Sequence, residues 1–360
     1  MPIATERPLD RARVALIYGP GNLAVDYAAA LPRGLERALL DLGASVSTLN
    51  LALFKRHVRE PYPSDSPLVR GIVDFSREGD RFDLCLGLFH DAYLTDELAE
   101  TLRSRCARTI NYPLNLLDQP HRFERALQIC DQTFCAEEAA LDSLRAKAPG
   151  RVRYVPMAAD PWIFRRLGAP AEPRLLFVGS LYAERQWLLD RCAAVIPTSA
   201  FGPGHDVPGV ARGLARELVR RRRVPRPLQA ARMLARAAFR DRRVVSDEEF
   251  VRLAAEHGVS VGFSEVRQER TGALFHKVRL REYEAAMSGL CHLARRLPEL
   301  ERGFDGGREM VLYDDPAGIP ELLSRIRAGD LDFRSIGEAA RRRAERDHTW
   351  TERLRAAFTA

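Results

Sequence analysis

Apolar runs and amphipathic stretches alternate along the first half of the chain. Each apolar run is short and bounded by charged or turn-forming residues, and the loop Gly19-Pro20-Gly21-Asn22 separates the first run from the first helical pattern. Strands are expected at residues 13–18, 46–51, 82–89 and 109–114, and helices at residues 24–42 and 96–106. This order of strand, helix and strand is typical of a parallel sheet.

The same pattern continues to about residue 155 and starts again at residue 174. Before the restart, strands are expected at residues 129–135 and 152–155, with a helix at residues 137–147 between them. A chain of 360 residues exceeds the usual size of one domain. The predicted fold class is therefore α/β with two Rossmann-like domains. We place these domains at residues 1–165 and 166–345, followed by a C-terminal helix at 346–360 that packs back toward the N-terminal domain.

Positive charge is concentrated in one segment. The net charge of the chain is +7, whereas residues 211–243 alone carry +10, so the remainder is at −3. Arg232, Arg236 and Arg240 stand at four-residue spacing and predict a basic amphipathic helix. Such a helix could lie on an anionic membrane surface, bind a phosphorylated acceptor or present a solvated face. Nucleic acid is not an expected partner, because the segment has few aromatics and no nucleic-acid module is recognisable.

Cysteine usage and hydropathy limit the class of protein further. The six cysteines form no C-x-x-C motif, and none has a histidine at zinc-finger spacing, which argues against a disulfide framework and a metal site. The motif Asp330-Leu331-Asp332 lies in a polar connection and is interpreted as surface, so no metal site is predicted. The chain contains no apolar run of 18 residues and no apolar stretch of a signal peptide near its start. We expect a cytoplasmic protein, with peripheral membrane association as the alternative.

A glycine-containing loop follows the first strand of the second series. Gly179, Ser180 and Tyr182 come directly after the apolar run and before the helical pattern at residues 184–193. Backbone N–H groups at a helix N-terminus favour phosphate, while Ser180 can add a hydroxyl and Arg185 a positive charge. The alternative is an ordinary turn between a strand and a helix.

The stretch at residues 277–293 predicts a helix with one polar face. Arg281 and Glu284 are three residues apart and share a face, whereas Tyr283 and Met287 share another. Gly289 stands where a left-handed C-terminal residue is expected, and a short buried strand should follow. The simpler interpretation of Arg281 and Glu284 is an ordinary ion pair.

Several segments together carry a family resemblance. They are residues 279–284 with 287–289, 298–300, 307–309 and Tyr313, residues 155–161, residues 176–182 with Glu184 and Arg185, and residues 348–350 with Arg353. These segments resemble CgeB-like glycosyltransferases of the GT-B superfamily, over roughly residues 108–200 and 245–358. The resemblance implies two Rossmann-like domains facing a central cleft, no chelated metal, a UDP- or dTDP-type sugar donor and a hydroxyl-bearing acceptor.

The resemblance also implies roles for individual residues. Glu284 is similar to the glutamate that binds the donor ribose, and Arg279 and Arg281 would neutralise the diphosphate leaving group. Eight residues before Glu284, where retaining enzymes of this kind carry a second glutamate, this chain has His276. The expected donor-binding residues are Gly179, Ser180, Tyr182, Arg185, Arg279, Arg281 and Glu284.

An inverting transferase also needs a general base beside the acceptor. His90 and Asp91 follow a predicted strand, and ligands bind beyond the carboxyl ends of such strands, so these two are the first candidates. A solvated strand end is the alternative interpretation of His90 and Asp91, and Asp118 is the second candidate. The predicted function is sugar transfer from a nucleotide-diphosphate sugar to a hydroxyl group in the interdomain cleft. The alternative is a non-catalytic GT-B-like protein that binds a nucleotide or a partner.

Overall fold

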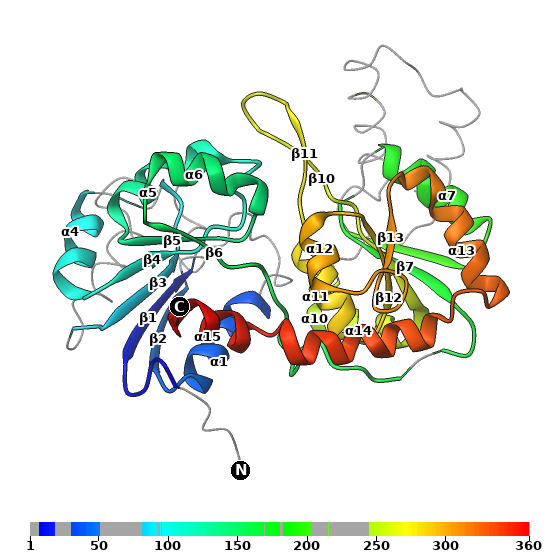
Figure 1. Ribbon diagram of the computed structural model, residues 1–360, viewed down its shortest axis with the longest axis horizontal. Helices are drawn as coiled ribbons and strands as arrows, with labels where there is room; N and C mark the ends of the chain where they lie inside the picture. Colours follow the sequence, from blue (N-terminus) through cyan, green and yellow to red (C-terminus); the bar gives the residue numbers. More distant parts are fainter. Residues whose placement is uncertain are drawn as a thin grey trace. The chain divides into compact units, whose positions relative to one another are not determined.

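The computed structural model describes residues 7–18, 30–50, 81–91, 94, 96–168, 170–180, 183–202, 215 and 245–359 (Figure 1). These residues form two compact units. The first unit comprises Met1–Ala158, Glu265–Val278 and His348–Ala360, and the second comprises Ala159–Ser264 and Arg279–Asp347. The loop at residues 19–22, Tyr182 and the basic segment at residues 211–243, apart from Ala215, lie outside the described residues.

The first unit is built on a parallel sheet of six strands in the order β2-β1-β3-β4-β5-β6. The strands are β1 (Arg13–Tyr18), β2 (Ser45–Asn50), β3 (Leu84–Leu88), β4 (Thr109–Asn111), β5 (Gln132–Cys135) and β6 (Val152–Tyr154). The helices are α1 (Ala30–Asp41), α4 (Asp96–Arg105), α5 (Glu124–Ile129) and α6 (Leu141–Lys147), with short 3-10 turns at Pro120–Arg122 and Glu138–Ala140. The central strands are apolar and buried, as expected for a parallel sheet covered on both faces.

The second unit is built on a parallel sheet of five strands in the order β13-β12-β9-β7-β8. The strands are β7 (Arg174–Val178), β8 (Thr198–Phe201), β9 (Gly258–Val261), β12 (Cys291–Arg295) and β13 (Val311–Tyr313). The helices are α7 (Ala183–Ala193), α10 (Asp247–His257), α11 (Leu280–Met287), α12 (Pro298–Gly303), α13 (Ile319–Ala328) and α14 (Phe333–Asp347), with a 3-10 turn at Pro316–Gly318. Gly289 ends α11 with a φ of 76°, which confirms the predicted left-handed residue.

Two later segments of the chain complete the first unit. One is the antiparallel hairpin β10 (Glu265–Arg267) and β11 (Leu274–His276), whose Val266 packs into a core cluster of the first unit, with Phe275 beside it. The other is α15 (Trp350–Thr359), which packs against α1. The ring of Trp350 meets that of Tyr112 edge-on, with 6.1 Å between their centroids. The sequence pattern did not predict that the hairpin belongs to the first unit.

The remaining expectations concern cysteines, membranes and metals. All six cysteines are buried and free. Within the described ranges, no helix is long and apolar enough to cross a bilayer. The same residues contain no group of three or more histidine, cysteine or carboxylate side chains that could hold a metal ion.

Candidate active site

The second sheet has a topological switch point between β7 and β9. Strand β7 pairs with β8 on one side and with β9 on the other, so successive connections leave the sheet in opposite directions. In open α/β sheets, ligands bind beyond the carboxyl ends of the strands at such a point. Gly179 and Ser180 follow β7 there, and Gly262 and Phe263 follow β9. Gly179 and Ser180, two of the donor-binding residues predicted after β7, therefore lie where a ligand is expected.

The loop after β7 depends on two glycines. The N–H of Gly179 donates to the carbonyl of Phe201 over 2.9 Å. Gly202 has a φ of +125°, and a Cβ at that position would lie 2.4 Å from the carbonyl oxygen of Gly179. A side chain at position 202 would thus displace the loop that leads into α7. Strand β7, Gly179, Ser180 and helix α7 follow one another along the chain in the order of a phosphate-binding loop.

Arg185 and Arg279 meet at Phe263. The Arg185 guanidinium lies over the Phe263 ring, 5.2 Å from its centroid, and its Nη1 donates to the carbonyl of Ser180 over 3.0 Å. Arg279, which precedes α11, donates from Nε to the carbonyl of Phe263 over 2.9 Å. The fold therefore brings two cations from distant parts of the sequence to Phe263, and Arg185 also contacts Ser180.

Arg281 and Glu284 form the ion pair that their spacing allows. The Nη1 of Arg281 lies 2.9 Å from Oε2 of Glu284, whose side chain is only 6% exposed. The Arg281 guanidinium also lies over the Phe250 ring, 4.1 Å from its centroid. Burial raises the pKa of Glu284, and Arg281 opposes that shift. The ordinary ion pair is therefore present, and the ribose contact of Glu284 stays a prediction.

A buried polar cluster lies directly under the start of α11. Oε2 of Glu282 accepts the backbone N–H of Arg279 over 2.8 Å, and burial raises the pKa of Glu282 to about 7. Nδ1 of His292 lies 2.7 Å from Oγ of Ser260, and burial lowers the pKa of His292 to about 3. A Cβ on Gly262 would lie 2.9 Å from both Oε1 of Glu282 and Nε2 of His292. The two side chains thus approach each other across a position that only glycine leaves open.

In the first unit, His90 and Asp91 follow β3, which pairs with β1 beside that sheet's own switch point. Both carboxylate oxygens of Asp91 accept backbone N–H groups in the first turn of α5, from Arg125 and Ala126, each over 3.0 Å. Nε2 of His90 lies 3.2 Å from Nη1 of Arg122. A guanidinium only donates, so this contact is a hydrogen bond when Nε2 is unprotonated.

Asp118 belongs to a buried charge cluster around Lys277. The Lys277 side chain is 4% exposed, and its Nζ lies 2.8 Å from Asp118 and 2.5 Å from Glu137. The same ammonium donates to the carbonyl of Leu114 and the side-chain oxygen of Asn115. Burial raises the pKa of Glu137, and the neighbouring Lys277 opposes that shift. Each of the three base candidates therefore has a polar partner within the first unit.

The hairpin adds a second contact to the loop that contains Asp118. Glu269 forms a bidentate ion pair with Arg122, at 3.0 and 3.1 Å. The backbone N–H of Glu269 also donates to the carbonyl of Asp118 over 2.8 Å. His90, Arg122 and Glu269 consequently form one connected chain of polar contacts in the first unit.

Glu282, Lys277 and Glu137 were not among the site residues predicted from the sequence. Glu282 sits in the predicted helix next to the conspicuous pair of Arg281 and Glu284. A buried role for Glu282 could have been suspected only because it is a charged residue in a segment that also contains many apolar residues. Lys277 opens the same segment, but its partners lie far earlier in the chain, so no local spacing indicated them.

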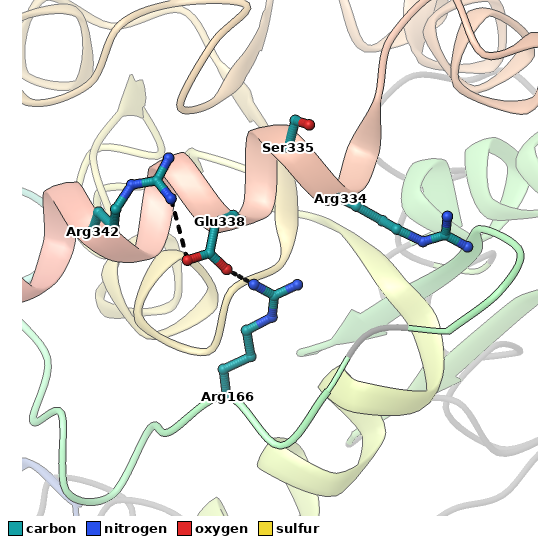
Figure 2. Close-up of a pocket in the computed structure, with 5 residues that line it drawn as sticks. All are labelled: Arg166, Arg334, Ser335, Glu338 and Arg342. Carbon is teal, nitrogen blue, oxygen red and sulfur yellow. Dashed lines mark hydrogen bonds and ion pairs between the residues drawn. The ribbon is translucent and has the colours of Figure 1, made fainter.

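A hollow on the second unit lies outside this arrangement (Figure 2). It is lined by Arg166, Arg334, Ser335, Glu338 and Arg342. Glu338 pairs with both Arg166 and Arg342, and Arg334 points away from it and donates to the carbonyl of Pro170. Asp332 accepts the Ser335 hydroxyl over 2.6 Å at the start of α14, which agrees with the surface interpretation of the Asp-Leu-Asp motif. The arginines of the hollow already contact protein acceptors, so we do not expect the hollow to bind an anion strongly.

Comparison with known proteins points to one class. Residues 212–359 match a family described as "Glycosyl transferase-like". That range includes Arg279, Arg281, Glu282 and Glu284. No curated protein matches the sequence.

Solved structures resemble the whole chain. HepE from Anabaena, crystallised with UDP-glucose, is 14% identical with a TM-score of 0.62, over 97% of this chain and 99% of its own. Sucrose-phosphate synthase from Thermosynechococcus elongatus is 17% identical with a TM-score of 0.60, over 96% of this chain and 98% of its own. A glycosyltransferase from Rickettsia africae is 10% identical with a TM-score of 0.62, over 97% of each chain. At such identities the likeness establishes the fold, and the predicted GT-B fold is confirmed.

Proposed function

We propose that the protein is a glycosyltransferase that moves a sugar from a nucleotide-diphosphate sugar to a hydroxyl group of an acceptor. The observation that carries the proposal is the meeting of Arg185 and Arg279 on Phe263, at the switch point of the second sheet. Two cations beside a helix N-terminus suit a diphosphate. The match to a glycosyltransferase-like family and the UDP-glucose complex of HepE, which has the same fold, support this choice of ligand.

The chemistry follows from the charges. When the bond between the sugar and the diphosphate breaks, negative charge grows on the leaving phosphate oxygen. Arg185 and Arg279 would stabilise that charge, together with the Ser180 hydroxyl and the N–H groups at the start of α7. Glu284 would accept the ribose hydroxyls beside Arg281, and Gly179 and Tyr182 would complete the donor site.

The acceptor hydroxyl loses its proton as the new bond to the sugar forms. His90 or Asp91 would take this proton, with Asp118 as the next candidate. Asp91 already holds two N–H groups of α5 and Asp118 already pairs with Lys277, so His90 is the preferred base. Its Nε2 can accept a proton once the contact to Arg122 is exchanged for the substrate.

Narrower features belong to the same proposal. We assign the protein to the CgeB-like group, with transfer of a hexose from a UDP or dTDP donor and without a chelated metal. Association of residues 211–243 with an anionic membrane surface is proposed on the basis of their charge of +10. Binding without catalysis is the second candidate function, and His276, in place of a second glutamate, favours it.

A ligand screen followed by a turnover assay tests the proposal. Thermal shifts would be measured with UDP-, dTDP- and GDP-sugars, since a ligand at 100 times its Kd adds about 2.7 kcal/mol to stability. Slow release of free nucleotide from a bound donor, lost in Arg185→Ala and Arg279→Ala, would support catalysis. Binding without any release would favour the non-catalytic alternative. The absence of any shift across the panel would contradict both.

A further inference from the structure

We propose that Glu282 is a positioning residue of the nucleotide site, and that its charge controls how strongly Arg279 and Arg281 attract the diphosphate. This inference rests on the proposed function. Glu282 would act through the arginines and would not touch the ligand itself. The site would therefore take up a proton when the donor binds.

The geometry fixes Glu282 beneath the arginines. Its Oε2 accepts the N–H of Arg279, the residue that starts α11, so the carboxyl group sets the backbone from which the Arg279 side chain extends. The residue is 2% exposed, which keeps its charge from being screened by water. A change of charge at Glu282 therefore acts on both arginines, and on Arg279 more than on Arg281.

His292 offers an acceptor for a hydrogen bond from a protonated Glu282. It is fully buried, its Nδ1 contacts Ser260, and its Nε2 has no hydrogen-bond partner among the described residues. That nitrogen and Oε1 of Glu282 lie on either side of Gly262, each 2.9 Å from the position that a Cβ would occupy there. An unpartnered buried acceptor is costly, and a protonated Glu282 is the nearby donor that could satisfy it.

The groups around Glu282 come from four elements. Arg279 and Arg281, at the start of α11, favour its ionised form, and Glu284 on the same helix is occupied by Arg281. His292 from β12 and Ser260 from β9 lie on the other side. The hydroxyl of Tyr313, from β13, donates to the carbonyl of Gly262 over 2.7 Å. Burial outweighs the two arginines and raises the pKa of Glu282 to about 7.

The direction of the pH dependence follows. An ionised Glu282 competes with the diphosphate for the arginines, whereas a protonated Glu282 leaves their charge to the ligand. The donor should therefore bind more weakly as pH rises through about 7. Coupling between the binding of two ligands to one protein, here the donor and a proton, is typically worth about 5–150-fold, and we expect the low end of this range: affinity should fall about five- to tenfold between pH 6 and 8.

Calorimetric titration with UDP-glucose tests this. Its diphosphate is esterified at both ends and does not titrate between pH 6 and 8, whereas the terminal phosphate of UDP does. Glu282→Gln keeps an oxygen for the N–H of Arg279 but cannot ionise, so its affinity should not change over this range. Glu321→Gln, an exposed residue of α13, is the matched control and should keep the wild-type pH dependence.

Two measurements on the wild-type protein keep the test independent of the variant. Titrations at pH 7 in buffers of different ionisation enthalpy should reveal proton uptake on binding. Without ligand, the thermal unfolding temperature should decrease as the pH is raised from 5 to 8. A carboxyl group whose pKa is higher in the folded than in the unfolded state makes the folded protein less stable as pH rises. Zero proton uptake, or the same pH dependence in Glu282→Gln, would overturn the inference alone. No binding of UDP-glucose at any pH would overturn it together with UDP-type donor recognition.

Discussion

Arginine dominates the positive charge of the candidate donor site, and its two roles there differ. The Arg185 guanidinium lies over the Phe263 ring, and Arg279 donates to the Phe263 carbonyl. Arg281 is already paired with Glu284 and stacked on Phe250. At the residue scale, the first two arginines should therefore contribute more to binding than the third.

Arg279→Ala should weaken binding of the nucleotide sugar by about 1.5–3 kcal/mol, the range for a hydrogen bond to a charged group. Isothermal titration with the donor found in the screen measures this. Arg308→Ala is the control, since Arg308 is 84% exposed in its side chain. Equal affinities for Arg279→Ala and Arg308→Ala would remove Arg279 from the donor site.

His90→Gln should lower turnover by roughly 10²–10⁴ if His90 is the general base, and should leave donor affinity unchanged. Steady-state rates and donor binding would be measured on the same preparation. Asp91→Asn is a less clean comparison, because one of its two contacts to the first turn of α5 is lost as well. Near-normal turnover in His90→Gln would transfer the role to Asp91 or Asp118, or indicate a mechanism with no protein base.

At the scale of elements, the buried ammonium of Lys277 connects the segment after the hairpin to loops of the first sheet through hydrogen bonds and ion pairs. Removing one partner from a buried ion pair commonly costs 3–5 kcal/mol, because the other charge is left without compensation. Lys277→Met should therefore lower the free energy of unfolding by about 3–5 kcal/mol. Denaturant unfolding at neutral pH gives the value.

A double variant separates charge from packing in this cluster. Lys277→Met combined with Glu137→Gln leaves no buried unpaired charge at position 137, so it should be more stable than Lys277→Met alone. If the double variant is no more stable than the single one, the loss comes from packing, and the ion pair contributes little.

The strands and helices before residue 158 were largely predictable from the chain, whereas several elements of the second unit were not. Strands expected at residues 13–18, 82–89 and 152–155 coincide with β1, β3 and β6, because apolar runs bounded by turns carry a clear signal. Strand β9 was not predicted, since Gly258–Val261 is short and follows α10 without a break. The hairpin was missed because most of its residues are exposed and show little alternation.

The candidate site was predictable only in its parts. Gly179, Ser180, Arg185 and Arg279 were chosen from local spacing and the family resemblance. That Arg185 and Arg279 both contact Phe263 depends on the order of the strands, which no local pattern contains. That Glu282 and His292 lie on either side of Gly262 likewise depends on β9 and β12 being neighbours.

At the scale of the whole molecule, the last helix belongs to the unit that the chain forms first. Trp350 is 3% exposed and packs edge-on against Tyr112. Trp350→Ala should cost about 3–5 kcal/mol, as for other buried aromatic residues. Hydrogen exchange should show the loss of protection in β4 and β5. Loss confined to α14 and the second sheet would contradict the assignment of α15 to the first unit.

The division of the first unit into three stretches of sequence has a consequence for synthesis. A ribosome completes residues 1–158 well before it reaches the hairpin at 265–278 and the helix that follows residue 348. Until then, Tyr112 lacks Trp350, and Glu137 is without the ammonium of Lys277. The nascent first unit therefore stays incompletely packed while the second unit is translated. Chaperones should consequently bind the amino-terminal part of the nascent chain more often than the remainder, although the amino-terminal part is synthesised first.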